Sequence, residues 1–145
     1  MKKILSILWI IWLILINIYV FRYIYMKPDN TATIHIHDQK RSVELAKTPE
    51  EQMSWLMNRP QMDDDKWMLF VRQDDMIRNF WMKNTMIPLD IIYIDSWLNI
   101  MNINNWIPYD LSQLSSSGMA RYVLELNAWQ TTKYNIKIRD KIEIK

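Results

Sequence analysis

An apolar run near the N-terminus constrains this chain more than any other feature. Residues 4–21 read ILSILWIIWLILINIYVF and are apolar except for Ser6 and Asn17. Eighteen residues in a helix extend for about 27 Å, which is close to the hydrocarbon thickness of a bilayer. The run therefore predicts a transmembrane helix, and Lys2 and Lys3 precede it as in a secretory signal.

The length of the run and the residues after it predict that it stays on the chain. It exceeds a normal signal-peptide core, and the bulky FRYIYM that follows lacks a small-residue cleavage pattern. We interpret residues 1–26 as an uncleaved signal-anchor, 27–31 as a linker and 32–145 as a domain on the extracytoplasmic side. A cleaved signal peptide is the alternative. Arg22 and Lys27 nearly balance the N-terminal lysines, so the positive charges on the two sides of the run give only weak evidence for the orientation of the helix in the membrane.

The rest of the chain has the size and composition of one β-rich domain. About 115 residues are enough for a single hydrophobic core, and the high isoleucine content favours strands. Beyond residue 27, the 14 basic and 16 acidic side chains form no evident basic face, which argues against nucleic acid. The absence of cysteine excludes disulfides, thiolate metal sites and a cysteine nucleophile. No pattern predicts a cofactor.

Alternating and capped segments predict the order of elements in this domain. TATIHIH alternates with period two, and SVELAK follows as its hairpin partner. Thr48, Pro49 and Glu51 predict a capped short helix that ends near Asn58. WMLFV, NFWMKNT, LDIIYI, LNIMNI, RYVLELNA and KIEIK read as strands, NAWQTTKY as one helical turn, and residues 115–117 as a loop. The predicted fold is α+β and mostly β, a compact antiparallel barrel-like sheet with one or two short helices.

Several segments resemble one protein family, in the same order along the chain. TPEEQMSWLMNRP, WMLFV, FWMKNTMIPLDIIYID, RYVLELNA and NIKIRD are similar to the family catalogued as domain of unknown function 192. The similarity covers about residues 42–143, and FWMKNTMIPLD is its most specific element. The resemblance implies a small exported or membrane-anchored prokaryotic domain with a compact β-rich fold. It implies no established biochemical activity.

Glycine is almost missing from this chain. There is one glycine, Gly118, beside eight tryptophans, whereas about 10 glycines are expected at this length. Trp97 falls in an expected hairpin turn, where a bulky residue at positive φ is an outlier. Trp81 stands where the resembled family itself has tryptophan. Four other tryptophans stand where that family typically has glycine: Trp55, Trp67, Trp97 and Trp129.

Two interpretations of these tryptophans are open. In the first, which we favour, UGA encodes glycine in the native organism, so that these positions, together with Trp9, Trp12 and Trp106, are suspect. In the second, the chain is a divergent member of the family with an aromatic-rich surface. Asn135 and Arg139 also occupy family glycine positions, and recoding of UGA cannot produce either of them.

Polar side chains in WMKNT and VLELNA predict a ligand-binding surface. On a strand, Trp81, Lys83 and Thr85 share one face, and so do Glu125 and Asn127. Lys83 is expected to meet Glu125 or Asp90 and to line a pocket for a small ligand or a glycan. The alternative is that these groups satisfy one another inside a small barrel. The candidate ligand-binding residues are Arg59, Trp81, Lys83, Asn84, Thr85, Asp90, Glu125 and Asn127.

The predicted function is a non-enzymatic binding or accessory module of the cell envelope, with an unidentified envelope ligand or protein as its partner. The alternative is a hydrolase of an envelope carbohydrate or peptide that uses Asp90 and Glu125 as a carboxylate pair. His35, His37 and the adjacent Asp38 offer part of a metal site, but they are more typical of the solvated face of an edge hairpin. We predict no metal site.

Overall fold

The computed structural model describes the chain except residues 1, 26–29 and 55; the side chains of 2–8, 21–25 and 53–54 are also outside the description. Contacts divide the chain into two units, residues 1–30 and 31–145. The first contains helix α1 (Lys2–Tyr25). Among the described residues, no helix combines the length and the apolarity that crossing a membrane requires. Most of the expected linker and Trp55 lie outside the described residues.

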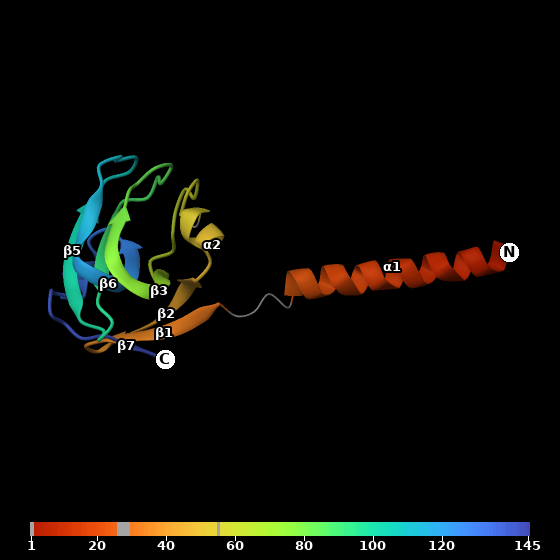
Figure 1. Cartoon of the computed structure of the whole chain (residues 1–145), viewed down its shortest axis with the longest axis horizontal. Helices are drawn as coiled ribbons and strands as arrows, with labels where there is room; N and C mark the ends of the chain where they lie inside the picture. The colour runs from red at the N-terminus through yellow and green to blue at the C-terminus, as the bar shows by residue number, and fades with distance from the viewer. Residues whose placement is uncertain (1, 26–29, 55) are drawn as a thin grey trace. The chain divides into compact units, whose positions relative to one another are not determined.

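Residues 31–145 form one seven-stranded sheet that curls into a half barrel (Figure 1). The strand order is β5-β4-β6-β3-β2-β1-β7, and every pair is antiparallel except β2 and β3. The mostly-β α+β prediction is therefore confirmed for this unit. The strands are β1 (Thr31–Ile36), β2 (Gln39–Ala46), β3 (Trp67–Phe80), β4 (Leu89–Ile94), β5 (Ile100–Trp106), β6 (Leu114–Asn127) and β7 (Glu143–Ile144), with short helices α2 (Pro49–Ser54) and α3 (Gln130–Lys133).

The predicted capping box starts α2. The N–H of Glu51 donates to the Thr48 hydroxyl at 3.2 Å, and the Thr48 N–H donates to the Glu51 carboxylate at 3.1 Å. The helix then ends at Ser54, earlier than the sequence predicts, and Asn58 has a left-handed φ of 60°. Such a residue cannot continue a right-handed helix.

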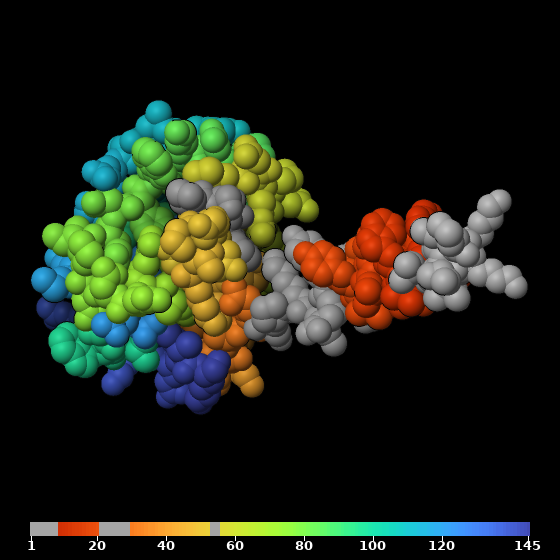
Figure 2. Space-filling view, turned by 45° about the vertical axis from the view of Figure 1, so that its right-hand side comes forward, coloured from red at the N-terminus to blue at the C-terminus, as the bar shows by residue number. Residues whose placement is uncertain are grey.

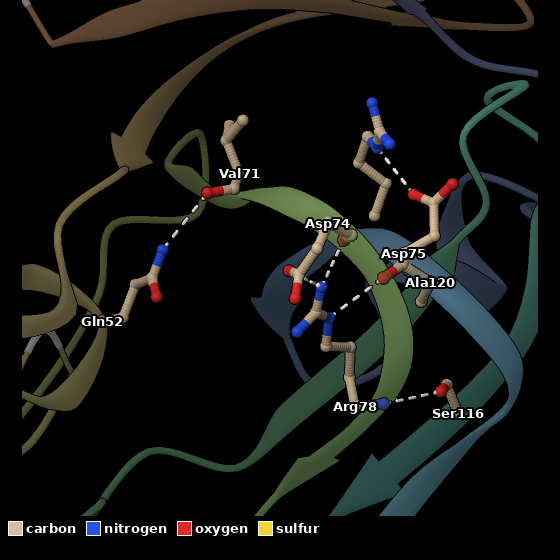
Figure 3. Close-up of polar contacts among 8 residues, drawn as sticks. Gln52, Val71, Asp74, Asp75, Arg78, Ser116 and Ala120 are labelled. Atoms are coloured by element: carbon tan, nitrogen blue, oxygen red, sulfur yellow. Dashed lines mark hydrogen bonds and ion pairs between the residues drawn. The ribbon is translucent and has the colours of Figure 1, made fainter.

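A wide bulge interrupts β3 where it pairs with β6. Residues 72–75 have no paired partner, because the register jumps between Val71 and Met76. Two ion pairs hold the bulge (Figure 3): Arg78 donates to the Asp74 carboxylate at 2.6 Å, and a second arginine, Arg121 of β6, donates to that of Asp75 at 2.6 Å. The bulge is thus a fixed part of the fold.

Two expectations about local structure were wrong. Residues 115–117 belong to β6, and the Ser116 hydroxyl accepts the N–H of Arg78 at 2.9 Å. The expected strand NFWMKNT is broken, because β3 ends at Phe80 and residues 81–88 form a loop. Strand alternation therefore does not decide which way Trp81 and its neighbours point.

The family glycine positions have a common backbone feature at the C-terminal end of the domain. Trp129, Asn135 and Arg139 all have positive φ, between 54° and 76°. In the hairpin turn after β4, the residue with positive φ is Leu98 and not Trp97, which is 75% exposed. The turn therefore does not force the Trp97 backbone into the left-handed region.

Trp67 differs from these residues because it is a core side chain. It is 1% exposed, and its indole N–H donates to the Gln130 side-chain oxygen at 2.7 Å. Tyr134 packs against the ring at a centroid distance of 6.0 Å. In this structure the indole fills space and satisfies a buried polar partner. The suspect Trp106 is also buried, but its indole nitrogen has no partner among the described residues.

Two clusters of buried apolar side chains lie against the sheet. The second contains Met68 and Phe70 of β3 with Ile91 and Tyr93 of β4. Glu125 of β6 pairs directly with Met68 on one side and with Ile91 on the other. Directly paired residues point to the same face of a sheet, so the Glu125 carboxyl lies on the face of this apolar cluster.

Candidate functional site

A pocket of about 690 Å³ lies over the second apolar cluster. Its wall is formed by α2 and the turn after it, by both halves of β3, by the loop of residues 81–85, and by single residues of β4, of β6 and of the loop before β6. Gln52 fixes α2 over the sheet, because its side-chain amide donates to the Ala46 carbonyl at 3.0 Å and to the Val71 carbonyl at 3.2 Å. Figure 3 shows the second of these contacts.

The loop that follows β3 forms the rim of the pocket and is held by backbone hydrogen bonds. The Met82 N–H donates to the Asp110 carbonyl at 2.9 Å, and the Tyr109 N–H donates to the Thr85 carbonyl at 3.1 Å. In Figure 2 the cyan loop that contains Asp110 accordingly borders the green loop at the top of the domain. Met82 is buried, and Asn84 turns the chain with a φ of 56°.

Glu125 lies in the wall of the pocket and is 5% exposed. Among the described residues, no hydrogen bond or ion pair reaches its carboxyl. Burial raises the pKa of this carboxyl to about 8, since there is little water to solvate a negative charge. Glu125 is therefore mostly a neutral acid at pH 7, which can donate one hydrogen bond and accept others. Burial, and then the Glu125 charge, raise the pKa of Tyr93 on the same face.

Arg72 lines the same pocket and follows Phe70 on one face of β3. Its buried Nε has no partner, and no ion pair reaches its guanidinium within the described part of the chain. Burial, followed by the charge of Arg78, lowers the pKa of Arg72, although it stays far above neutral. Lys83, the other cation in the wall, lies 5.3 Å from the centre of the Trp81 ring.

The pocket brings together five of the eight predicted site residues. These are Trp81, Lys83, Asn84, Thr85 and Glu125. Sequence reasoning missed Phe70, which lies inside the motif WMLFV, and Arg72, which directly follows it, because the sequence does not specify the neighbours of this strand. The expected contact of Lys83 with Glu125 or Asp90 is not found among the described ion pairs.

Asp90 does not belong to this pocket. It pairs with Leu126, one position away from Glu125, so the two carboxyls point to opposite faces of the sheet. The Asp90 carboxylate accepts hydrogen bonds from the N–H and the hydroxyl of Thr131 at 2.9 and 2.7 Å, and from the Asn105 amide at 2.5 Å. Asp90 is therefore a satisfied structural residue, and the expected carboxylate pair does not form.

The two other predicted residues, Asn127 and Arg59, also lie elsewhere. The Asn127 amide donates to the Met62 carbonyl at 2.8 Å, which ties β6 to the preceding loop. Arg59 lines a second pocket, of about 180 Å³, and its guanidinium lies 4.0 Å from the Glu44 carboxylate.

The two histidines of the first hairpin do not form a metal site in the described structure. His37 sits in the turn itself, with a φ of 53°, and its Nε2 lies 3.1 Å from the Asp140 carboxylate. No cluster of three potential metal ligands occurs within the described residues.

Comparison with known families places this fold. Residues 31–144 match DUF192, described as "Uncharacterized ACR, COG1430". The chain is a member of the DUF192 family. The resemblance carried by FWMKNTMIPLD and its neighbouring motifs is thereby confirmed, and the match spans the whole curled sheet, including the pocket. No curated protein matches the chain.

Two solved structures share the DUF192 fold of this chain. One is a protein of unknown function from Novosphingobium aromaticivorans, which is 37% identical with a TM-score of 0.71 over 78% of this chain and 83% of that one. The other, described as a putative transcription regulator from Sinorhizobium meliloti, is 32% identical with a TM-score of 0.73 over 79% of this chain and 92% of that one.

Proposed function

We propose that the DUF192 domain of this chain is a non-enzymatic module that binds a small ligand in the pocket around Glu125. The observation that supports this proposal is the pair of unpartnered polar side chains, Glu125 and Arg72, in one wall. Buried polar groups are normally hydrogen-bonded, because leaving one unpaired costs about 1–3 kcal/mol. A ligand that pairs with both groups recovers this free energy when it binds.

Binding fits the pocket better than catalysis does. A lone carboxylic acid needs a nucleophile or a base to complete a hydrolytic site. Among the described lining residues, Glu125 is the only carboxyl group, and the Thr85 hydroxyl donates to the Lys83 carbonyl at 3.4 Å and has no base beside it. Since Asp90 faces the other side of the sheet, a carboxylate-pair hydrolase lacks its second member.

We further propose, from the sequence, that the apolar run at residues 4–21 anchors the domain to the membrane, with the domain on the extracytoplasmic side. The support for this is the apolar run at residues 4–21, the two lysines before it and the absence of a cleavage pattern after it. The ligand is then a component of the cell envelope.

The binding proposal is tested by titrating the isotope-labelled full chain with a library of small fragments. We expect the indole N–H resonance of Trp81 to shift on binding, whereas that of Trp97, outside the pocket, stays fixed. Recovered fragments should be chemically unchanged. If no fragment moves the Trp81 resonance, or if fragments are turned over, the proposal fails.

The anchoring proposal can be tested because the chain has no cysteine. A Thr132→Cys substitution adds one thiol at an exposed position of α3. We expect a membrane-impermeant maleimide to label this thiol in intact cells, after removal of any outer membrane, and the protein to stay with the membrane after alkaline carbonate washing. Labelling only after lysis, or release by carbonate, would contradict the proposal.

A further inference from the structure

We infer that the pocket takes an elongated anionic ligand: an acidic group held by Arg72, an apolar body, and an uncharged hydrogen-bond acceptor that reaches Glu125. This inference rests on the proposed binding function and names the chemical class of the ligand. It follows from where the two unpartnered groups stand on neighbouring strands, what lies between them, and which charges surround the pocket.

The two polar groups enter the pocket from different levels of the sheet. Glu125 pairs with Met68, and Arg72 lies four residues further along β3. Phe70 stands between these two levels on the same face of the strand. No ion pair joins the two side chains among the described residues, although both line the pocket. A molecule with polar groups at both ends can satisfy both side chains.

The wall between the two groups is apolar. Phe70 lies between Met68 and Arg72 on the same face of β3, and it is level with Val123 of β6 and Tyr93 of β4 in the same apolar cluster. A polar group placed against this part of the sheet would lose its water without finding a partner there. The body of the ligand is therefore apolar.

The charges around the pocket select an anion. The ionisable groups in its described wall are Arg72, Lys83 and Glu125. The charges of Asp74 and Arg78 also act on Arg72, but these two residues form an ion pair with each other at 2.6 Å. Glu125 is mostly neutral at pH 7, because burial raises its pKa to about 8, so the two cations dominate and repel a positively charged ligand. Next to Glu125, the sheet presents the Tyr93 phenol, which is also neutral at this pH. The neutral Glu125 carboxyl then donates a hydrogen bond to an acceptor on the ligand.

The inference is tested with ω-hydroxyoctanoate as the probe, bound to the full chain in phosphatidylcholine nanodiscs and measured by equilibrium dialysis. Octanoate lacks the distal acceptor, octanol lacks the acid, and ω-aminooctanoate replaces the acceptor by a cation. An Arg72→Gln variant controls for partition of the probe into lipid. We expect ω-hydroxyoctanoate to bind most tightly, and Arg72→Gln to weaken its binding about tenfold or more.

The role of Glu125 is tested by pH. For the parent chain, we expect affinity for ω-hydroxyoctanoate to fall about tenfold between pH 7 and pH 9, because the donor form of the carboxyl is lost. A Glu125→Gln variant keeps a neutral donor. We expect it to bind within about threefold of the parent at pH 7 and to show no such fall.

The outcomes separate the inference from the proposed function. If octanol binds as well as the acids, and Arg72→Gln changes nothing, the pocket binds ligands but is not selective for anions, and the inference is overturned. The inference is also overturned if ω-aminooctanoate binds best, because Glu125 then acts as an anion. If neither these probes nor any fragment shifts the Trp81 resonance of the folded chain, the proposed function itself fails.

Discussion

The tryptophans at family glycine positions make opposite predictions about stability. Replacing Trp67 by glycine should strongly destabilise the domain, whereas replacing Trp129 by glycine should stabilise it slightly. The two substitutions are chemically identical, so each is the control for the other. Their environments differ: Trp67 is 1% exposed, and Trp129 is 73% exposed with a φ of 71°.

The size of each effect follows from these environments. Truncating a buried aromatic side chain costs about 3–5 kcal/mol, and glycine in a strand adds about 0.5–1 kcal/mol. Loss of Trp67 also leaves the Gln130 oxygen without its 2.7 Å hydrogen bond, which costs about 1 kcal/mol more. The sum, about 4.5–7 kcal/mol, approaches the whole stability of a small domain. At position 129, glycine removes the strain of a left-handed backbone, which is about 1–2 kcal/mol. This gain outweighs the loss of stability that comes from the larger conformational entropy of glycine in the unfolded chain.

The assay is urea unfolding of the full chain, followed by far-UV circular dichroism so that the loss of an indole does not remove the signal. We expect Trp67→Gly to unfold at much lower urea than the parent, or to be unfolded without urea, and Trp129→Gly to unfold at slightly higher urea. The reasoning is refuted if Trp67→Gly is as stable as the parent. That result would instead support glycine at position 67 in the native protein.

The remaining predictions concern coding and two carboxyl groups. If UGA encodes glycine in the native organism, the suspect tryptophan positions will have UGA codons and Trp81 will have UGG, and peptide masses from that organism will fit glycine at the UGA positions. UGG codons at all the suspect positions would exclude recoding. Because the Glu125 pKa rises to about 8 on folding, the stability that it contributes is present below pH 4.5 and lost as pH rises through 8. The free energy of unfolding of Glu125→Gln, measured in urea, should change less with pH than that of the parent chain. An equal pH dependence in the two proteins would show that Glu125 is not its source. Asp90→Asn should cost about 1–3 kcal/mol without changing probe binding, because it disturbs the hydrogen bonds from Thr131 and Asn105. Reduced binding by the folded variant would show that Asp90 contributes to the pocket.

Local signals in the sequence predicted local structure well. The capping box at Thr48 and Glu51 forms as expected because its hydrogen bonds join residues three apart. Strand LDIIYI and the helical turn near residue 130 were found for the same reason, since their signals are complete within a few residues. The segments of β6 that carry serines were missed because their partner, the end of β3, is distant in sequence.

The candidate site was predicted only in part because it depends on register. Glu125, Lys83 and Thr85 were chosen for their chemistry and do meet in the pocket. Asp90 was chosen on the same grounds, yet a shift of one position in the β4–β6 pairing sends it to the other face. Arg72 was missed because its place depends on a bulge that the sequence alone does not reveal.

The contrast between the two buried carboxyl groups supports the proposed function more strongly than either group does alone. The Asp90 carboxylate receives three hydrogen bonds, so its burial is explained by the fold itself. Glu125 lies on the adjacent strand and is 5% exposed, and its carboxyl receives no hydrogen bond among the described residues. An apolar residue at position 125 would extend the surrounding cluster and avoid the cost of an unpaired acid. A carboxyl group held there without a partner is what the proposed binding function would explain.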